Sequence, residues 1–533
     1  MSQDTEDLRR LQSETRTASF GRATSDLLLV PGLTVLYHTD LRRVGERAAL
    51  SGLAAGQDAA LSRVGPAFAA PGQAVARPLG DVYLSRTPLR LAPGERPGSL
   101  RLLRDGSRTP LAADGVPVEA ERAISPEELE RGVVLLLAER IVLLLSLIDP
   151  VGPGTLPRFG LVGESPALVR LRQEIRRVAD LDVPVLLRGE TGTGKELVAS
   201  ALHEAGSRRT RPYLAVNMAA IPPALAAAEL FGAARGAFTG ADRPRAGYFT
   251  RAQGGTLFLD EIGETPPEVQ PLLLRALESR EIQPVGGERP LTVDVRLVAA
   301  TDADLEAAVA DGRFRAPLLH RLSGYEILVP PLRARREDFG RLFVHFLTRE
   351  LEATGEAGRL DLAAQDRPWI PAALVARLAA FDWPGNVRQL RNAVRQLVIA
   401  GRGAAEVELG PQLERLLGPT TPVSAATAPP SGPLPRPRKT YRRPEDVGDD
   451  EMLAVLQENR WRLQPTAARL GISRTALYQK IEKSPHIRKA ADLDRDEIEQ
   501  AFQAASGDLD GMAERLAVSK RGLQRQMKRL GVP

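Results

Sequence analysis

The stretch VPVLLRGETGTGKELVASALHEA, residues 183–205, decides the fold of the central part of this chain. It begins with an apolar run typical of a buried strand and ends with a segment of helical periodicity. The loop between them consists of Gly189, Glu190, Thr191, Gly192, Thr193, Gly194 and Lys195. A glycine-rich loop of this kind lets backbone N–H groups wrap phosphates while the lysine reaches the terminal ones. We therefore predict an α/β nucleotide-binding domain.

One position departs from the general P-loop pattern. Glu196 stands where Ser or Thr usually helps to hold Mg²⁺, and we still count it among the nucleotide-binding residues. The alternative, a glycine-rich turn without a nucleotide, fits the order of strand, loop and helix less well.

A second apolar strand follows downstream and ends in two carboxylates. The sequence GTLFLDE, residues 255–261, delivers Asp260 and Glu261 to the end of that strand. Phosphoryl transfer needs a carboxylate for the ATP-bound Mg²⁺ and a second one to orient the attacking water. We predict these roles for Asp260 and Glu261 respectively, although a strand ending in two acids is by itself common.

The composition is that of an ordinary folded protein. Apolar residues make up 43% and charged residues 26% of the 533 residues, so we expect roughly three or four domains. The absence of cysteine excludes disulfides and thiolate metal sites, and the five histidines show no ligand-like spacing. The polar N-terminal segment lacks the apolar core of a secretory signal, so we expect a cytoplasmic protein.

The most apolar stretch is VVLLLAERIVLLLSLI, residues 133–148. Glu139 and Arg140 interrupt it, and a charged pair at mid-bilayer depth is costly. We therefore predict two buried strands at this place and no membrane partner.

Composition shifts divide the chain into segments. Residues 418–447 contain eight prolines and almost no core-forming side chains, which is typical of an extended linker. An internal repeat follows, because AARLGISRTALYQKI from Ala467 aligns with AERLAVSKRGLQRQM from Ala513. We predict a β-sandwich head at 20–148, an α/β ATPase core at 158–330, a helical lid at 331–417, the linker, and all-α helix-turn-helix units at 448–484 and 494–533.

Two further motifs lie between the P-loop and the second strand. ELFG occupies residues 229–232, and a hexapeptide follows that consists of Gly236, Ala237, Phe238, Thr239, Gly240 and Ala241. With these motifs, residues 161–417 resemble the AAA+ domain of bacterial enhancer-binding proteins, the activators of sigma-54 RNA polymerase. The resemblance implies that the hexapeptide loop contacts sigma-54 through its Phe and Thr. A packed turn with Phe238 in the core is the alternative for the hexapeptide taken alone.

Other positions gain a role from the same resemblance. Asn217 matches the residue that couples nucleotide state to Glu261, and Arg388 matches the lid arginine that senses the γ-phosphate. Arg315 and Arg321 match the two arginines that reach the ATP of a neighbouring subunit, which implies a homo-oligomeric ring, a hexamer built from dimers. ATP and Mg²⁺ are the implied cofactors. Two departures are Pro317, in place of an acidic residue, and Asp302, in place of the usual sensor Asn.

The tail has the sequence pattern of a helix-turn-helix. From Pro435 to the end it holds 20 Lys and Arg against 15 Asp and Glu, a surplus of five that suits an anionic partner or a solvated surface. The first repeat resembles the Fis-type DNA-binding domain of the same family, and a plain helical hairpin is the alternative. The residues expected to face enhancer DNA are Arg474, Thr475, Tyr478 and Lys480 in the first repeat, and Lys520, Arg521, Gln524 and Arg525 in the second.

Short strands and turns fill residues 20–148, and one strand is expected at VYLSRTPLRL, residues 82–91. This region resembles a forkhead-associated domain, a β-sandwich that binds phosphothreonine proteins. On that resemblance Arg63, Ser85 and Arg86 would bind the phosphate, and Asp114 would lie in the peptide-facing loop. Pro88 and Asp114 depart from the family pattern, so a sandwich kept as a regulatory or dimerising module is an equal alternative.

We predict a sigma-54-dependent transcriptional activator that binds enhancer DNA and remodels the closed sigma-54 RNA polymerase holoenzyme complex by ATP hydrolysis. An AAA+ chaperone without a promoter role is one alternative, and it explains neither the hexapeptide nor the tail. A DNA-binding repressor with a degenerate ATPase is another, and it does not explain the intact catalytic set.

Overall fold

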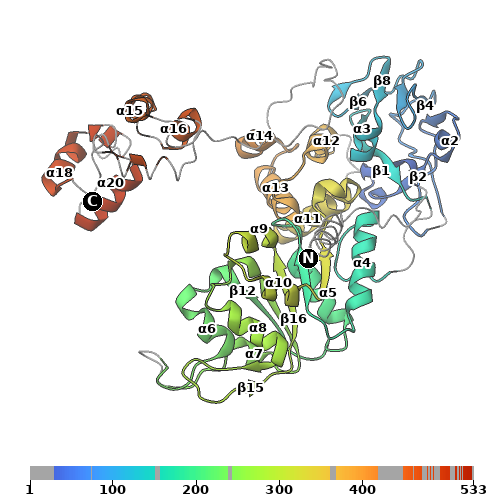
Figure 1. Cartoon of the computed structure of the whole chain (residues 1–533). Helices are drawn as coiled ribbons and strands as arrows, with labels where there is room; N and C mark the ends of the chain where they lie inside the picture. Colours follow the sequence, from blue (N-terminus) through green and yellow to red (C-terminus); the bar gives the residue numbers. More distant parts are fainter. Residues whose placement is uncertain are drawn as a thin grey trace, which may run out of the picture. The chain divides into compact units, whose positions relative to one another are not determined.

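In the computed structural model the chain forms two units, Met1–Ser424 and Ala425–Pro533. The structure describes residues 29–73, 75–150, 156–237, 243–360 and 368–417, together with parts of 448–530. Figure 1 shows the whole chain and labels many of its helices and strands, which are numbered in chain order. In these described parts, no helix is long and apolar enough to cross a membrane.

Two antiparallel sheets form the N-terminal part of the first unit, which we call the head. The first sheet has the order β2-β1-β10-β9-β6-β7, with β1 Val30–Tyr37, β2 Arg47–Ala49, β6 Leu111–Ala113, β7 Val116–Pro117, β9 Val133–Leu137 and β10 Ile141–Ile148. The second has the order β3-β4-β5-β8, with β3 Ala59–Leu61, β4 Leu89–Pro93, β5 Leu100–Leu103 and β8 Glu121–Ile124. The short helices α2 Ser51–Ala54 and α3 Pro126–Arg131 connect the two sheets, and η1 Leu41–Arg43 lies between β1 and β2. The relation of this sandwich to forkhead-associated domains stays a prediction.

One strand of the head is shorter than the sequence suggests. The apolar residues from Val82 onward predict a strand, but β4 begins only at Leu89. Asp81 starts a turn, since its carboxylate accepts a hydrogen bond from the backbone N–H of Tyr83 at 2.8 Å. Side chains of Asp that bind the backbone two residues on stabilise turns against strands.

The apolar stretch at residues 133–148 forms β9 and β10, as predicted. Along both strands, alternate side chains enter two different cores. Leu143 and Leu145 pack inside the sandwich, whereas Val142 and Leu144 pack against helices of the lid. Strands buried on both faces are apolar at every position, which accounts for the unbroken run.

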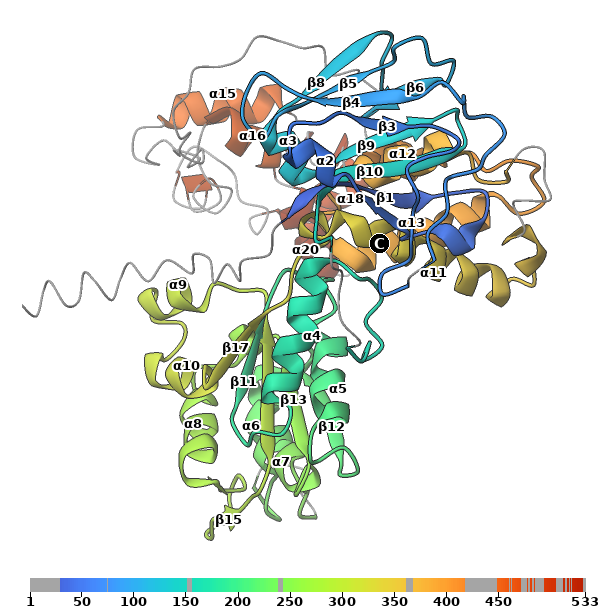
Figure 2. The same ribbon diagram turned by 90° about the vertical axis from the view of Figure 1, so that its right-hand side faces the viewer.

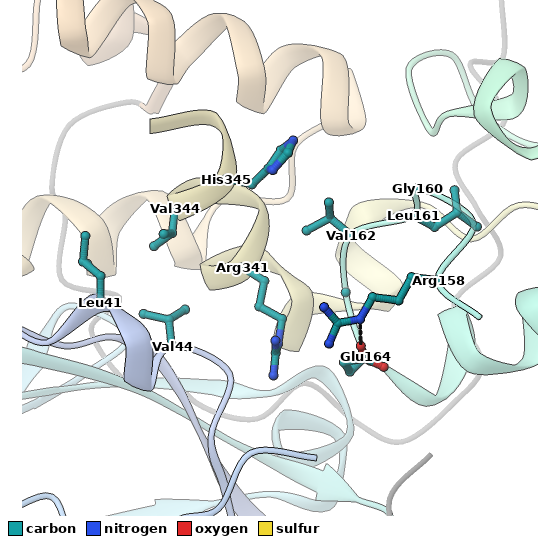
Figure 3. A pocket seen from close by; sticks show the side chains of 11 residues that line it. Leu41, Val44, Arg158, Gly160, Leu161, Val162, Glu164, Arg341, Val344 and His345 are labelled. Carbon is teal, nitrogen blue, oxygen red and sulfur yellow. Dashed lines mark ion pairs between the residues drawn. The ribbon is translucent and has the colours of Figure 1, made fainter. Parts of the chain in front are cut away.

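Hydrogen bonds join the head to the rest of the first unit. The Tyr37 hydroxyl donates to the carbonyl oxygen of Ile370 at 2.8 Å, and Arg47 Nη2 donates to the carbonyl oxygen of Glu164 at 2.9 Å. Figure 2 shows α12 beside β9 and β10, in agreement with their shared core. Figure 3 shows a cavity between the head and the lid, and its volume is about 500 Å³. It is lined by Leu41 and Val44 of the head, by residues between 158 and 164, and by residues of α11. The head and the lid are therefore continuous in packing.

The ATPase core is a parallel sheet with the order β12-β13-β16-β11-β17. Its strands are β11 Val185–Arg188, β12 Tyr213–Asn217, β13 Thr256–Asp260, β16 Arg296–Thr301 and β17 Tyr325–Leu328. Its helices are α4 Pro166–Val178, α5 Lys195–Ala205, α6 Pro223–Phe231, α7 Tyr248–Arg251, α8 Gln270–Ser279, α9 Leu305–Ala310 and α10 Ala316–Leu322, with η2 Met218–Ala220, η3 Ile262–Glu264 and the hairpin β14 Glu281–Ile282 and β15 Leu291–Thr292. Sites in such sheets lie at the carboxyl ends of the strands.

The lid follows the last strand of this sheet. It consists of η4 Leu332–Ala334, η5 Arg336–Asp338, α11 Phe339–Ala353, η6 Ala357–Leu360, α12 Ala372–Ala380, α13 Asn386–Ala400 and α14 Pro411–Leu417. The second unit contains α15 Asp449–Glu458, α16 Leu463–Leu470, α18 Arg495–Ala504 and α20 Lys520–Leu530. Each of its two repeats has a small apolar core of its own, the first around Trp461 and the second around Ile498.

Candidate functional site

The P-loop joins β11 to α5, and its glycines meet specific steric demands. Gly192 and Gly194 have φ values of 79° and 104°, where a side chain would be strained. A Cβ atom on Gly189 would lie 2.8 Å from the carbonyl oxygen of Val329, so the loop also passes close to the residue that follows β17. The loop leads directly into α5, whose free backbone N–H groups and dipole favour anions.

Lys195 is the first residue of α5 and is only 6% exposed. Its Nζ donates hydrogen bonds to the carbonyl oxygens of Gly189 at 2.8 Å and Glu190 at 3.5 Å. Three N–H donors on a buried ammonium are thus held at the mouth of the loop, where a phosphate oxygen can replace a carbonyl.

A cavity of about 770 Å³ collects residues from three distant parts of the sequence. Its lining includes the P-loop from Thr191 to Glu196, the carboxylates Asp260 and Glu261, and Arg388 of the lid. It further includes Gly160, Leu161, Val162, Leu197, Arg335, Leu342, His345, Phe346, Arg349, Glu350, Ala353, Val387, Arg391 and Arg395. The cavity has an apolar end at residues 160–162 and a cationic rim, a combination that suits a nucleotide.

The two strand-end carboxylates differ in their surroundings. Asn217 ends the neighbouring strand β12, and its Nδ2 donates to Asp260 Oδ2 at 3.4 Å, so the hydrogen bond seen for its amide goes to Asp260. Burial and the nearby Asp302 carboxylate raise the pKa of Glu261 above its usual value. A hydrogen bond from the Thr191 hydroxyl lowers the pKa of Asp302 and fixes this carboxylate beside Glu261. The pKa of Glu261 and the pKa of Asp302 are therefore shifted in opposite directions.

The two predicted finger arginines lie away from the cavity of their own chain. Arg315 precedes α10, and its backbone N–H donates to Gln270 Oε1 at 2.9 Å. Arg321 donates to the carbonyl oxygen of Leu277 at 3.2 Å. Both side chains are exposed, and neither lines the cavity. Within one chain the structure does not bring them to the P-loop.

The hexapeptide is only partly described. Gly236 has a φ of 79°, and the backbone N–H of Ala237 donates to the carbonyl oxygen of Ala234 at 3.2 Å. The base of the loop is closed by two hydrogen bonds of 2.9 Å between Ala233 and Arg245. Phe238, Thr239, Gly240 and Ala241 lie outside the described residues.

The remaining predicted sites are in the head and the tail. In the head, the backbone N–H of Arg63 donates to the carbonyl oxygen of Ser85 at 3.1 Å, which places these residues and the exposed Arg86 side by side. Asp114, expected to face a peptide, instead accepts a hydrogen bond from the backbone N–H of Val134 at 3.0 Å and pairs with Arg122 at 3.3 Å.

In the tail, Lys480 Nζ lies 3.5 Å from Asp449 Oδ1, so a DNA phosphate would have to compete with this ion pair. Gln524 is exposed on α20. Arg474, Thr475 and Tyr478 lie outside the described residues, as do the side chains of Lys520, Arg521 and Arg525. The helix-turn-helix contacts with DNA therefore stay predictions.

Sequence reasoning missed the lid residues that touch the P-loop. Arg335 is 4% exposed, and its Nη2 donates to the carbonyl oxygen of Thr193 at 3.2 Å. Arg333 and Asn386 contact Glu190. A signal was available for Asn386, because it directly follows the Pro384-Gly385 break that marks the start of the lid helix.

Three family models match successive parts of the chain. Residues 161–328 match the family described as "Sigma-54 interaction domain", residues 333–411 the "AAA+ ATPase lid domain", and residues 444–483 "Bacterial regulatory protein, Fis family". The chain is 42% identical over 332 residues to the transcriptional regulatory protein ZraR of Escherichia coli (strain K12), covering 62% of this chain and 70% of ZraR. It is 37% identical over 394 residues to the C4-dicarboxylate transport transcriptional regulatory protein DctD of Rhizobium meliloti (strain 1021), covering 73% of this chain and 76% of DctD. The crystal structure of NtrX from Brucella abortus in complex with ATP is 32% identical and covers 70% of each chain, with a TM-score of 0.42.

Proposed function

Because the chain belongs to the family of sigma-54-dependent transcriptional activators, we propose that it binds enhancer DNA as a ring and remodels the closed polymerase complex at each turn of ATP hydrolysis. The prediction of an ATPase that regulates transcription is confirmed by these relatives. Sigma-54 RNA polymerase and DNA are its partners. The observation that carries the mechanism is the single cavity that unites the P-loop, the strand-end carboxylates and the lid arginine.

In this mechanism the P-loop and Lys195 hold the phosphates of ATP, and Glu261 accepts the proton of the attacking water. The carboxylate of Asp260 at the end of β13 is a hard oxygen donor of the kind that Mg²⁺ prefers. Bound with ATP, Mg²⁺ would supply charge neutralisation at the β- and γ-phosphates. Arg388, in the lid, contacts the γ-phosphate.

The domain division and the DNA contacts predicted from the sequence are part of the proposal. Two small cores in the tail support two helix-turn-helix units, and two hydrogen bonds between Ala233 and Arg245 close the base of the segment that carries the hexapeptide. Transcription from a sigma-54 promoter with purified holoenzyme tests the proposed ATP-dependent activation. Open complexes should form with ATP and not with a non-hydrolysable analogue. Equal affinity for enhancer and random DNA at physiological salt would refute the role of the tail.

Replacement of Thr239 by alanine should leave ATP hydrolysis unchanged and abolish open-complex formation, because the proposed role of this side chain is contact with sigma-54. ATPase assays and promoter transcription measure the two activities separately. Thr210→Ala, at an exposed threonine outside the loop, serves as the control. Full open-complex formation by Thr239→Ala would show that the loop assignment is wrong.

Replacement of Asp302 by asparagine should shift the pH dependence of hydrolysis. Loss of this negative charge removes one cause of the raised Glu261 pKa, so Glu261 loses its proton at lower pH. The acid limb of the kcat profile should therefore move to lower pH. Asp304→Asn, two residues away and exposed, should leave the profile in place. An unchanged acid limb in Asp302→Asn would contradict the coupling.

For the head we propose phosphopeptide recognition that controls the ATPase. A backbone hydrogen bond joins Arg63 to Ser85, Arg86 is next to Ser85 in the chain, and the structure shows no ion pair for either arginine within the described residues. Two guanidinium groups and a hydroxyl on neighbouring segments are the donors that a phosphothreonine needs. Binding of a phosphothreonine peptide, and its loss in Arg63→Ala, would support this role, whereas equal binding of the unphosphorylated peptide would refute it.

A further inference from the structure

Glu190 presents a physical problem, because it is an acid within a loop that binds phosphates. A carboxylate facing a polyanion would repel it. In the structure both oxygens of Glu190 are held by the guanidinium of Arg333, with Nη1 at 2.6 Å from Oε2. Hydrogen bonds from Arg333 and Asn386 lower the pKa of Glu190 to about 2. The carboxylate is therefore ionised and directed to the lid.

Asn386 connects three segments with one side chain. It is fully buried and begins α13, and its Nδ2 donates to Glu190 Oε2 and to the carbonyl oxygen of Thr191, each at 3.1 Å. Its Oδ1 accepts a hydrogen bond of 2.8 Å from the backbone N–H of Leu332 in η4. Its φ of 51° lies in the left-handed region, which Asn tolerates better than most residues.

The backbones of the loop and the lid are also in direct contact. The backbone N–H of Arg388 donates to the carbonyl oxygen of Gly192 at 3.3 Å. A Cβ atom on Gly192 would lie 2.4 Å from the carbonyl oxygen of Gly385. Arg388, which lines the nucleotide cavity, therefore takes its position from the same contact that Asn386 secures.

We propose that Glu190, Arg333 and Asn386 form a latch that positions Arg388 relative to the P-loop, and that Glu190 is a positioning residue for the lid and not a ligand of the nucleotide. The inference rests on the proposed function, in which the P-loop binds ATP and Arg388 reads its γ-phosphate. The latch makes the two surfaces that enclose the nucleotide one rigid element. Loss of the latch should weaken the binding of ATP more than the binding of ADP, so the protein should discriminate less between the two nucleotides.

A purely structural role predicts a different result. Arg333 and Glu190 are 43% and 42% exposed, and an exposed ion pair contributes little to stability. If the pair only stabilised the fold, its removal would either lower the melting temperature or have no effect. In both cases the ratio of the two nucleotide affinities would stay constant. The ratio therefore separates the two roles.

The test measures equilibrium binding of mant-AMPPNP, a fluorescent non-hydrolysable ATP analogue, and of mant-ADP to the full-length protein. The variants are Asn386→Gly, which removes the side chain without backbone strain, Glu190→Gln, Arg333→Gln and the double variant Glu190→Gln with Arg333→Gln. We expect Asn386→Gly and Glu190→Gln to weaken binding of the analogue by about tenfold and mant-ADP by less than about twofold. The double variant should bind the analogue no more weakly than the single variant of lower affinity, because both groups serve one interaction.

Arg402→Gln, which removes an exposed charge elsewhere on the lid, is the matched control and should bind both nucleotides as the unmodified protein does. Equal weakening of both nucleotides, or an unchanged ratio in variants with an unchanged melting temperature, would overturn the latch. If Asn386→Gly does not fold, Glu190→Gln decides, since its side chain is half exposed. If the unmodified protein bound neither probe, the assignment of the nucleotide site would fail together with the latch.

Discussion

Replacement of Arg315 by alanine should lower ATP hydrolysis by roughly 10³-fold or more while ATP binding is retained. The physical reason is that Arg315 is exposed and does not line the cavity of its own chain, and the proposed ring brings its charge to the ATP of a neighbour. A guanidinium that reaches the transition state neutralises charge that the ground state does not carry, so its loss affects kcat and not binding. ATPase rates and mant-AMPPNP affinity measure the two effects.

Mixing experiments make this prediction sharper. A Lys195→Ala subunit should bind no ATP but still present an intact Arg315, whereas an Arg315→Ala subunit binds ATP and lacks the finger. A mixture of the two inactive variants should therefore recover hydrolysis at the interfaces where each supplies what the other lacks. Arg313→Ala, at an exposed arginine paired with Asp311, is the control and should keep full activity. Failure of every mixture to recover activity would place the finger in its own subunit and remove the argument for a ring.

Replacement of Leu144 by alanine should destabilise the lid as well as the head. Leu144 is 1% exposed and packs in the core that α11, α12 and α13 share with β1, β9 and β10. Truncation of a buried leucine costs about 2–5 kcal/mol through lost burial and a residual cavity. Because that cavity would open between the two parts, amide hydrogen exchange in α12 Ala372–Ala380 should rise.

The neighbouring residue provides the control for this prediction. Leu143 is fully buried and faces the interior of the sandwich. Leu143→Ala should cost a similar free energy of unfolding and raise exchange in the strands of the second sheet, with α12 kept as protected as in the unmodified protein. Equal protection of α12 in both variants would show that the head is a separable cap. Raised exchange of α12 in Leu144→Ala alone would show that a change in the head alters the lid through their shared core.

The secondary structure and chemistry around the P-loop could be predicted from sequence because local rules determine them. Residues 192 and 194 adopt positive φ values, which favour glycine. An apolar strand places Asp260 at the carboxyl end of β13. The head strand expected from Val82 was wrong in extent, because the carboxylate of Asp81 binds the backbone and starts a turn. Asp114 was expected in a peptide-facing loop, and its ties to Val134 and Arg122 could not be read from spacing.

The sequence by itself predicted a phosphate-binding loop, and it determined which carboxylates end the next apolar strand and that both faces of the strands at residues 133–148 are buried. It could not determine what covers the second face, since an apolar run specifies burial and not the partner. Only the tertiary structure placed the lid there. It also decided the partner of Glu190, because Arg333 lies 143 residues away and chain folding alone brings the two charges together.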